Sequence, residues 1–193
     1  MGRVYRDEII LAKREELKKQ KYVTLENGFY VQGKVLKFNE KDLFDSFSIA
    51  LPDIMRVMPI DLARIKYPSE FRPEIIYTTL DLCTNMGFSI LWEGLQDQNV
   101  KSIAGNMMAA IHRSNADFLI YGLKNMSKIG GCYFAFRSHA MDVDIYNMVL
   151  IVPVGNNLIQ SNFNCLFRHY KDWLKVVKLM WGSIKEINNG EKF

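Results

Sequence analysis

The segment VDIYNMVLIV, residues 143–152, decides the fold of this 193-residue chain. Read as a strand, it carries Val143, Ile145, Val149 and Ile151 on one face and Tyr146, Met148, Leu150 and Val152 on the other. Because both faces are apolar, we expect the strand to be covered on both sides. The turn signals that flank it, Met141-Asp142 and Gly155-Asn156, leave no room for crossover helices, so its neighbours are predicted to be antiparallel. An antiparallel sheet that is buried on both faces needs a helical layer on each side.

The end of the chain, residues 164–190, predicts the helix for one of these layers. From Tyr170 onward, apolar residues recur at helical spacing for nearly five turns. They are Trp173, Leu174, Val177, Met180, Trp181, Ile184 and Ile187. Asn188-Asn189-Gly190 supplies a stop signal. We expect this helix to lie along the sheet, with its two tryptophans among the costliest residues to truncate.

The preceding segments predict the other elements of the sheet and its second layer. The clearest internal helix covers residues 98–113, with Asp97 as its N-cap. A short helix follows Pro59, and two X-Pro steps, Tyr67-Pro68 and Arg72-Pro73, enclose an irregular loop. Strands are predicted over residues 47–51, 74–79, 87–92, 117–123 and 132–138.

Residues 1–44 are predicted to be an extension of helix plus β-hairpin. Residues 4–20 are strong helix formers with only a thin apolar stripe, so this helix is expected on the outside or at an edge. Asn27-Gly28 between two β-rich runs is a hairpin signal. Residues 45–193 then form the main domain. Its predicted class is α+β, an antiparallel sheet covered by helices on both faces.

Composition is typical of a soluble globular protein, with 49% hydrophobic and 24% charged residues. No apolar run approaches the ~18 to 20 residues that span a bilayer, and the first ten residues do not read as a secretory signal. The three cysteines, Cys83, Cys132 and Cys165, are odd in number and far apart, so we expect buried thiols in a reducing compartment. These features predict a cytoplasmic protein without membrane insertion.

The net charge of +4 is concentrated at the start of the chain. Residues 1–21 contain seven Lys or Arg against four Asp or Glu, so the remainder is nearly neutral. A globally basic surface for nucleic acid is therefore not supported. Contact of the basic first helix with nucleic acid or an anionic surface is kept as one alternative.

Catalytic motifs are absent from the sequence. The histidines lack metal-ligand spacing, and the chain has no G-x-S-x-G elbow, P-loop or G-x-G-x-x-G segment. Asp142 and Asp144 would point the same way from a strand, but they flank a turn, where Asp is common. No catalytic, cofactor-binding or metal-binding residue is assigned, and no cofactor is expected. An enzyme or small-ligand binder of unrecognised type, with His139, Asp142 and Asp144 converging at a strand end, is the second alternative.

The segment RIKYPSEFRP, residues 64–73, is the candidate partner-binding site. It gathers Arg64, Lys66, Tyr67, Phe71 and Arg72 around two prolines. A rigid loop that presents aromatic rings and cations suits the recognition of another protein. The competing interpretation is that Tyr67 and Phe71 pack into the core and the prolines only redirect the chain.

Three segments carry a resemblance to a known superfamily: KYPSEFRPEII (66–76), DIYNMVLIVPV (144–154) and FNCLFRHYKDWLKVVKLMWGSI (163–184). With the order of elements, they resemble the Mog/PsbP-like α/β/α sandwich, and more closely small uncharacterised bacterial proteins of the DcrB type. The resemblance covers roughly residues 45–187 and leaves out the N-terminal helix and hairpin. It implies an antiparallel sheet between helices and no catalytic set. It suggests a non-catalytic accessory protein whose partner is another protein.

Overall fold

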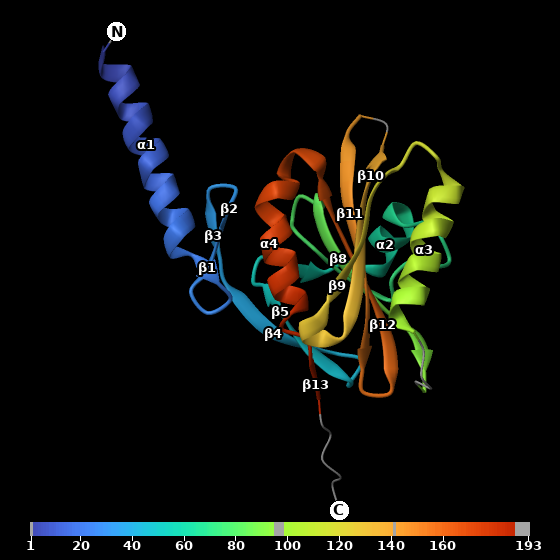
Figure 1. Ribbon diagram of the computed structural model, residues 1–193. Coiled ribbons are helices and arrows are strands. Elements are labelled where there is room, and N and C mark those ends of the chain that lie inside the picture. Colours follow the sequence, from blue (N-terminus) through green and yellow to red (C-terminus); the bar gives the residue numbers. More distant parts are fainter. Residues whose placement is uncertain (1, 95–98, 141, 188–193) are drawn as a thin grey trace, which may run out of the picture.

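The computed structural model describes residues 2–94, 99–140 and 142–187, with side chains from residue 6 onward. Within these ranges the α-helices are α1 (Gly2–Lys21), α2 (Ile60–Lys66), α3 (Val100–Ser114) and α4 (Tyr170–Trp181). A seven-stranded antiparallel sheet forms the centre of the molecule (Figure 1). Its strands are β6 (Arg56–Val57), β7 (Ile75–Thr78), β8 (Thr84–Glu93), β9 (Leu119–Met126), β10 (Gly131–His139), β11 (Asp144–Val154) and β12 (Asn157–Leu166).

The order across this sheet is β6-β7-β8-β12-β11-β10-β9, and every neighbouring pair is antiparallel. The predicted strand at 143–152 corresponds to β11, and the antiparallel neighbours expected for it are β10 and β12. The strand β12 was not predicted as a separate element. It lies between β8 and β11, so it joins the two halves of the sheet.

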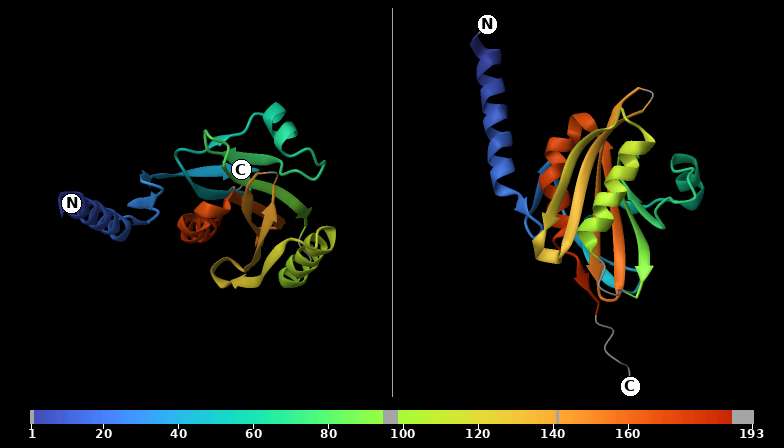
Figure 2. Two further views of the ribbon diagram at one scale, coloured as in Figure 1. Left: turned by 90° about the horizontal axis from the view of Figure 1, so that it is seen from above. Right: turned by 45° about the vertical axis from the view of Figure 1, so that its right-hand side comes forward.

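Helices cover both faces of the sheet, as Figures 1 and 2 show for α4 and α3 on opposite sides. Met148 and Leu150 of β11 share one core cluster with Trp181 of α4. Val149 of β11 shares the other cluster with Ala104 of α3. The predicted class, an antiparallel sheet between helical layers, is confirmed. Val143 was expected on a covered face, but it precedes β11 and is 40% exposed.

Two small sheets complete the layer that contains α4. One has the order β13-β5-β4, and the other is the meander β1-β2-β3. Their bounds are β1 (Val23–Thr24), β2 (Gly28–Val31), β3 (Lys34–Leu36), β4 (Phe38–Leu43), β5 (Phe47–Pro52) and β13 (Lys185–Glu186). Phe29, Leu36 and Phe47 belong to the same core cluster as α4. The boundary proposed at residue 44 falls in the turn between β4 and β5, and the division into two domains stays a prediction.

The first helix and its hairpin follow the sequence signals closely. α1 extends away from the sheets (Figure 1), and its side chains from residue 6 to 21 are exposed, as predicted. The turn at residues 25–27, which ends at Asn27, joins β1 to β2, and Gly28 is the first residue of β2. A second tight turn, Gln32-Gly33, joins β2 to β3 with positive φ at both residues, which suits a two-residue hairpin loop. Among the described helices, none is both long and apolar enough to cross a membrane.

The closing helix is shorter than predicted. α4 has 12 residues and ends at Trp181, and the chain then forms β13, which pairs with β5. Ser183 fixes this change of direction, because its Oγ accepts a hydrogen bond from the Ala50 backbone N–H at 3.0 Å and donates one to the Met180 carbonyl at 2.6 Å. Ile184 is buried in the core, but it lies between the turn at 182–183 and β13 rather than in a helix. The predicted stop signal at residues 188–190 lies outside the described residues.

One side-chain contact caps the start of α3, and another anchors α4 to the sheet. The expected N-cap of α3, Asp97, lies outside the described residues. Asn99 is the N-cap, and its side chain accepts a hydrogen bond from the Ser102 backbone N–H at 3.1 Å. Trp181 anchors α4 to the sheet, because its Nε1 donates to Ser161 Oγ at 2.9 Å and both residues are fully buried. This bond explains a serine in the middle of the core.

Candidate functional site

The candidate site is a groove on the face of the sheet that carries α2 and α3. It has a volume of about 390 Å³, within the usual range of ligand pockets. Four of the five predicted binding residues line it, namely Lys66, Tyr67, Phe71 and Arg72. Arg64 does not line it and lies 3.8 Å from the Asp61 carboxylate on the exposed side of α2. We call this groove the amide groove, after the side-chain amides of Asn147, Gln160, Asn162 and Asn164 that line it.

The loop at residues 67–73 forms one wall because a glycine allows it to approach the sheet. Pro73 lies directly over Gly87 of β8. A Cβ atom at position 87 would lie 2.5 Å from Pro73 Cγ, closer than real contacts allow. The fit of the loop against the sheet therefore depends on the missing side chain at Gly87.

A buried hydrogen-bond network holds Tyr67 in this wall. Thr78 Oγ1 donates to Asn85 Oδ1 at 2.7 Å, and Asn85 Nδ2 donates to Asn164 Oδ1 at 2.8 Å. Asn164 Nδ2 in turn donates to the Tyr67 hydroxyl at 3.1 Å. Burial raises the pKa of Tyr67. The network explains why the buried Asn85 is tolerated, and it makes Tyr67 a structural part of the wall.

Lys66 is a half-buried cation at one end of the groove. Its Nζ donates to the Leu82 carbonyl oxygen and to Asn85 Oδ1, the latter at 3.3 Å. Desolvation by burial lowers the pKa of Lys66, and the nearby Cys83 and Asp81 partly oppose this. Within the described part of the chain, no carboxylate forms an ion pair with Lys66. A carboxylate from outside could therefore form an ion pair with Lys66 there.

The floor of the groove is a row of amides on β11 and β12. Cross-strand pairing sets Asn147 opposite Asn164. Gln160 Nε2 donates to Asn162 Oδ1 at 2.9 Å, and Asn147 Nδ2 donates to Ser138 Oγ at 2.9 Å. This leaves Asn162 Nδ2, Gln160 Oε1 and Asn147 Oδ1 without a hydrogen bond to any described residue. The floor thus offers free donors and acceptors to a molecule in the groove.

The two aromatic residues of the predicted site have different environments. Tyr67 belongs to the buried network, which agrees with the interpretation that it packs inward. Phe71 is 95% exposed, so its ring lies free at the rim. Arg72 Nη1 donates to the Ser69 carbonyl at 3.3 Å and so stays beside Phe71. The opposite wall is apolar and includes Met107 and Ile111 of α3.

The alternative site at the end of β10 is built differently from the expectation. Asp144 accepts hydrogen bonds from Arg137 and, at 2.5 Å, from His139. The Arg137 guanidinium lowers the pKa of Asp144. Asp142 is exposed and forms no hydrogen bond or ion pair with the described residues. Within the described ranges, no group of three or more His, Cys, Asp or Glu side chains is arranged to hold a metal ion.

The amide floor is a finding of the structure that the sequence predictions did not include. One signal for it was present in QSNFN, residues 160–164, where Gln160, Asn162 and Asn164 alternate with Ser161 and Phe163. Such alternation predicts a strand with one polar face. The partner residues on β11 and β8 could be found only from the register.

Comparison with solved structures identifies the fold. CyanoP, the cyanobacterial PsbP of Synechocystis sp. PCC 6803, superposes with a TM-score of 0.58 at 11% identity, covering 83% of this chain and 98% of that one. The chain has a PsbP-like fold. This confirms the architecture implied by the resemblance of its sequence segments. At such low identity the match to the PsbP-like fold concerns architecture alone.

Two more distant structures also match. LpqN of Mycobacterium tuberculosis, described as involved in cell envelope biogenesis, has a TM-score of 0.42 at 9% identity, covering 86% of this chain and 98% of that one. A Pseudomonas aeruginosa protein of unknown function, PA94, described as a putative regulator, has a TM-score of 0.39 at 6% identity, with coverages of 76% and 94%. No protein-family model matches the sequence, and no curated protein matches it significantly.

Proposed function

We propose that this protein is a non-catalytic accessory protein that binds an extended segment of a partner protein in the amide groove. The observation that carries the proposal is the row of side-chain amides with free donors and acceptors between the 67–73 loop and α3. Each residue of an extended peptide presents one N–H and one C=O, and side-chain amides can pair with both. Asn162 Nδ2 can donate to a peptide carbonyl, and Asn147 Oδ1 can accept from a peptide N–H.

The charges of the groove select the kind of segment. Lys66 and Arg72 line the same groove, and neither forms an ion pair with the described residues. A carboxylate in the segment would make charge-assisted hydrogen bonds with them. We therefore expect the bound segment to contain Asp or Glu.

The walls of the groove add an apolar requirement. The exposed ring of Phe71 and the side chains of Met107 and Ile111 surround the amide floor. Aromatic, Met and Arg side chains are enriched at the centres of protein interfaces. An apolar residue next to the acidic one would bury this ring against α3. The expected ligand is thus a short extended peptide with one apolar and one acidic side chain.

Selection from a random peptide library on the purified full chain tests this proposal. Enriched peptides would be synthesised and their Kd measured by fluorescence anisotropy. Phe71→Ala and Arg72→Met should each weaken binding about tenfold or more, which corresponds to about 1.4 kcal/mol. Arg64→Met is the matched control, because Arg64 is a cation of the same segment outside the groove, and it should bind as the wild type does.

The result that would overturn the proposal is equally specific. Failure to enrich any peptide would contradict it. Peptides that bind equally well to wild type, Phe71→Ala and Arg72→Met would also contradict it, because such peptides bind elsewhere. Both substituted side chains are at the rim, so the variants are expected to fold, and their melting temperatures serve as the check.

A further inference from the structure

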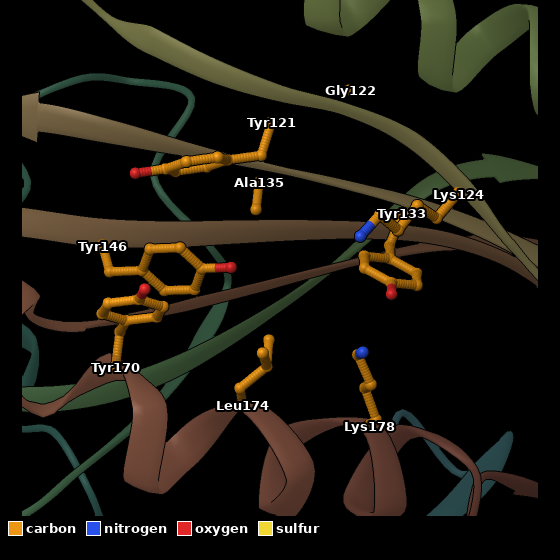
Figure 3. Close-up of a pocket in the computed structure, with 9 residues that line it drawn as sticks. All are labelled: Tyr121, Gly122, Lys124, Tyr133, Ala135, Tyr146, Tyr170, Leu174 and Lys178. Atoms are coloured by element: carbon orange, nitrogen blue, oxygen red, sulfur yellow. The ribbon is translucent and has the colours of Figure 1, made fainter.

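A second pocket lies on the opposite face of the sheet, between α4 and strands β9, β10 and β11 (Figure 3). Four tyrosines, Tyr121, Tyr133, Tyr146 and Tyr170, and two lysines, Lys124 and Lys178, contribute most of its lining, and we call it the tyrosine pocket. Its volume is about 190 Å³, roughly half that of the amide groove. It therefore suits a small molecule.

Regular elements hold the side chains of this pocket. Tyr170, Leu174 and Lys178 are spaced by four residues on α4, so they share one face of the helix. Lys124 and Tyr133 are direct partners across β9 and β10. Side chains placed on helices and strands are held more rigidly than side chains on loops. The pocket is thus formed before any ligand arrives.

Two of the tyrosines are largely buried, yet their hydroxyls have no partner in the described part of the protein. Tyr146 is 5% exposed and Tyr133 is 7% exposed, and neither hydroxyl forms a hydrogen bond with any described residue. Figure 3 shows the Tyr146 hydroxyl pointing into the middle of the pocket. Burial raises the pKa of Tyr146, with Tyr121 adding to the effect, so this hydroxyl keeps its proton as a donor. A hydroxyl that has no protein partner and points into a pocket is available to donate to a bound acceptor.

The charges in the pocket are positive. In Figure 3 the amino groups of Lys124 and Lys178 lie on the side that faces the Tyr146 hydroxyl, one from the sheet and one from the helix. Lys178 Nζ lies 5.7 Å from the centre of the Tyr133 ring. In the part of the chain that the structure describes, neither lysine forms an ion pair, and no carboxylate lines the pocket. Two ammonium groups and a hydroxyl donor that face one another suit an anion.

The other side of the pocket is aromatic. The rings of Tyr146 and Tyr170 are 4.7 Å apart, and those of Tyr121 and Tyr146 are 5.8 Å apart. Leu174 lies beside them on α4. Aromatic rings pair favourably with another ring in tilted or offset contact. An inorganic anion would leave this wall uncovered, whereas an anion with a flat apolar body would cover it.

We propose that the tyrosine pocket is a binding site for a small aromatic carboxylate. The carboxylate group lies between Lys124, Lys178 and the Tyr146 hydroxyl, and the ring packs against Tyr170 and Leu174. This site is independent of the amide groove, because the two pockets open on opposite faces of the sheet. Binding a small aromatic acid would add ligand responsiveness to a protein-binding module.

Calorimetric titration of the full chain tests this site with benzoate, 4-hydroxybenzoate and cinnamate. Benzamide supplies the ring without the charge, and inorganic phosphate supplies the charge without the ring. At least one of the three acids should bind saturably and at least tenfold more tightly than either control compound. If none of the three acids binds saturably, or if benzamide or phosphate binds equally well, the proposal is wrong.

Variants locate the binding in the pocket. Lys124→Met, Lys178→Met and Tyr146→Phe should each weaken binding of the acid about tenfold, while Lys128→Met, an exposed lysine of the same β9–β10 connection, should leave it unchanged. Tyr146→Phe keeps the ring and removes only an unpaired hydroxyl, so it retains the fold and tests the hydrogen bond. Unchanged binding of the acid by the three pocket variants would place it elsewhere and overturn the assignment. Failure here would leave peptide binding by the amide groove intact, so the two proposals fail separately.

Discussion

Tyr146 and Asn147 are adjacent in β11, yet one lines the tyrosine pocket and the other the amide groove. The two pockets share strands β10 and β11 and differ in what covers them. The 67–73 loop, held by a hydrogen-bond network, forms a wall of the amide groove together with α3, whereas helix α4 covers the tyrosine pocket. Side chains alternate between faces along a strand, so one sheet can carry two chemically unrelated pockets back to back. The following substitutions are designed to separate the two pockets.

The largest effect is expected from Trp181→Ala. The substitution removes a fully buried ring and the hydrogen bond to Ser161 under α4, and such truncations cost about 3–5 kcal/mol. Chemical denaturation should show this loss of free energy of unfolding, whereas Trp92→Ala, at a half-exposed position, should change it by about 0.5 kcal/mol or less. At temperatures where the variant stays folded, the affinity of the tyrosine pocket for the aromatic carboxylate should fall more than the affinity of the amide groove for the peptide. An equal loss of affinity at both pockets would mean that removal of the Trp181 side chain also disturbs the amide groove through the sheet.

Gly87→Ala is designed to disturb the amide groove, through its 67–73 loop, and to leave the tyrosine pocket intact. The new Cβ would collide with Pro73, and such overpacking costs about 1–3 kcal/mol. Peptide binding by the amide groove should weaken, and binding of the aromatic carboxylate by the tyrosine pocket should persist. Gly105→Ala is the control, because a Cβ there meets no atom within 4 Å and alanine favours the helix by about 0.5–1 kcal/mol. A fully stable Gly87→Ala protein with normal peptide binding would contradict the tight seating of the loop.

Removing one hydroxyl from each pocket gives a smaller but sharper comparison. Tyr67→Phe breaks the bond from Asn164 and should cost about 1 kcal/mol. Tyr146→Phe removes a hydroxyl that has no partner among the described residues, so without ligand the free energy of unfolding should be unchanged or slightly higher. Urea unfolding of the two variants in parallel measures the difference. Equal destabilisation would mean that the Tyr146 hydroxyl is satisfied in the free protein.

The smallest effect concerns the titration of Lys66. Because burial lowers its pKa in the folded state, the unfolded chain binds more protons between that value and the ordinary 10.5. Lys66 should therefore make the free energy of unfolding rise with pH through this window, and Lys66→Met should remove this rise. NMR titration of the Lys66 side chain checks the direction. Addition of an acidic peptide should move the pKa upward, and no movement would argue against a carboxylate beside Lys66.

How far the sequence could predict this structure depends on the range of the interactions. The apolar alternation of 143–152 and the helical period of 98–113 are local, and both segments formed as predicted apart from their ends. Ile184 and Ile187 continue the helical period of α4, but pairing of Lys185–Glu186 with β5 ends the helix, and that partner is far away in the sequence. A local pattern in the sequence cannot reveal that pairing with a distant strand will replace the last turns of a helix.

The candidate sites were predicted only where their residues are contiguous. The 64–73 segment supplied four groove residues, but which aromatic is buried depends on Asn164, nearly a hundred residues away. The tyrosine pocket draws on four separate elements, β9, β10, β11 and α4, and no motif connects them in the sequence. Strand register and helix docking bring these residues together.

The central position of β12 has a consequence for synthesis of the chain. Residues 157–166 are the last strand of the main sheet to be made, yet they alone connect β8 to β11. While the ribosome is still translating residues before 157, the β6–β8 and β9–β11 groups each have an open edge, and unpaired edges invite association with other chains. Protection of the nascent chain should matter most until Leu166 has emerged from the exit tunnel, when a single insertion can close both edges at once.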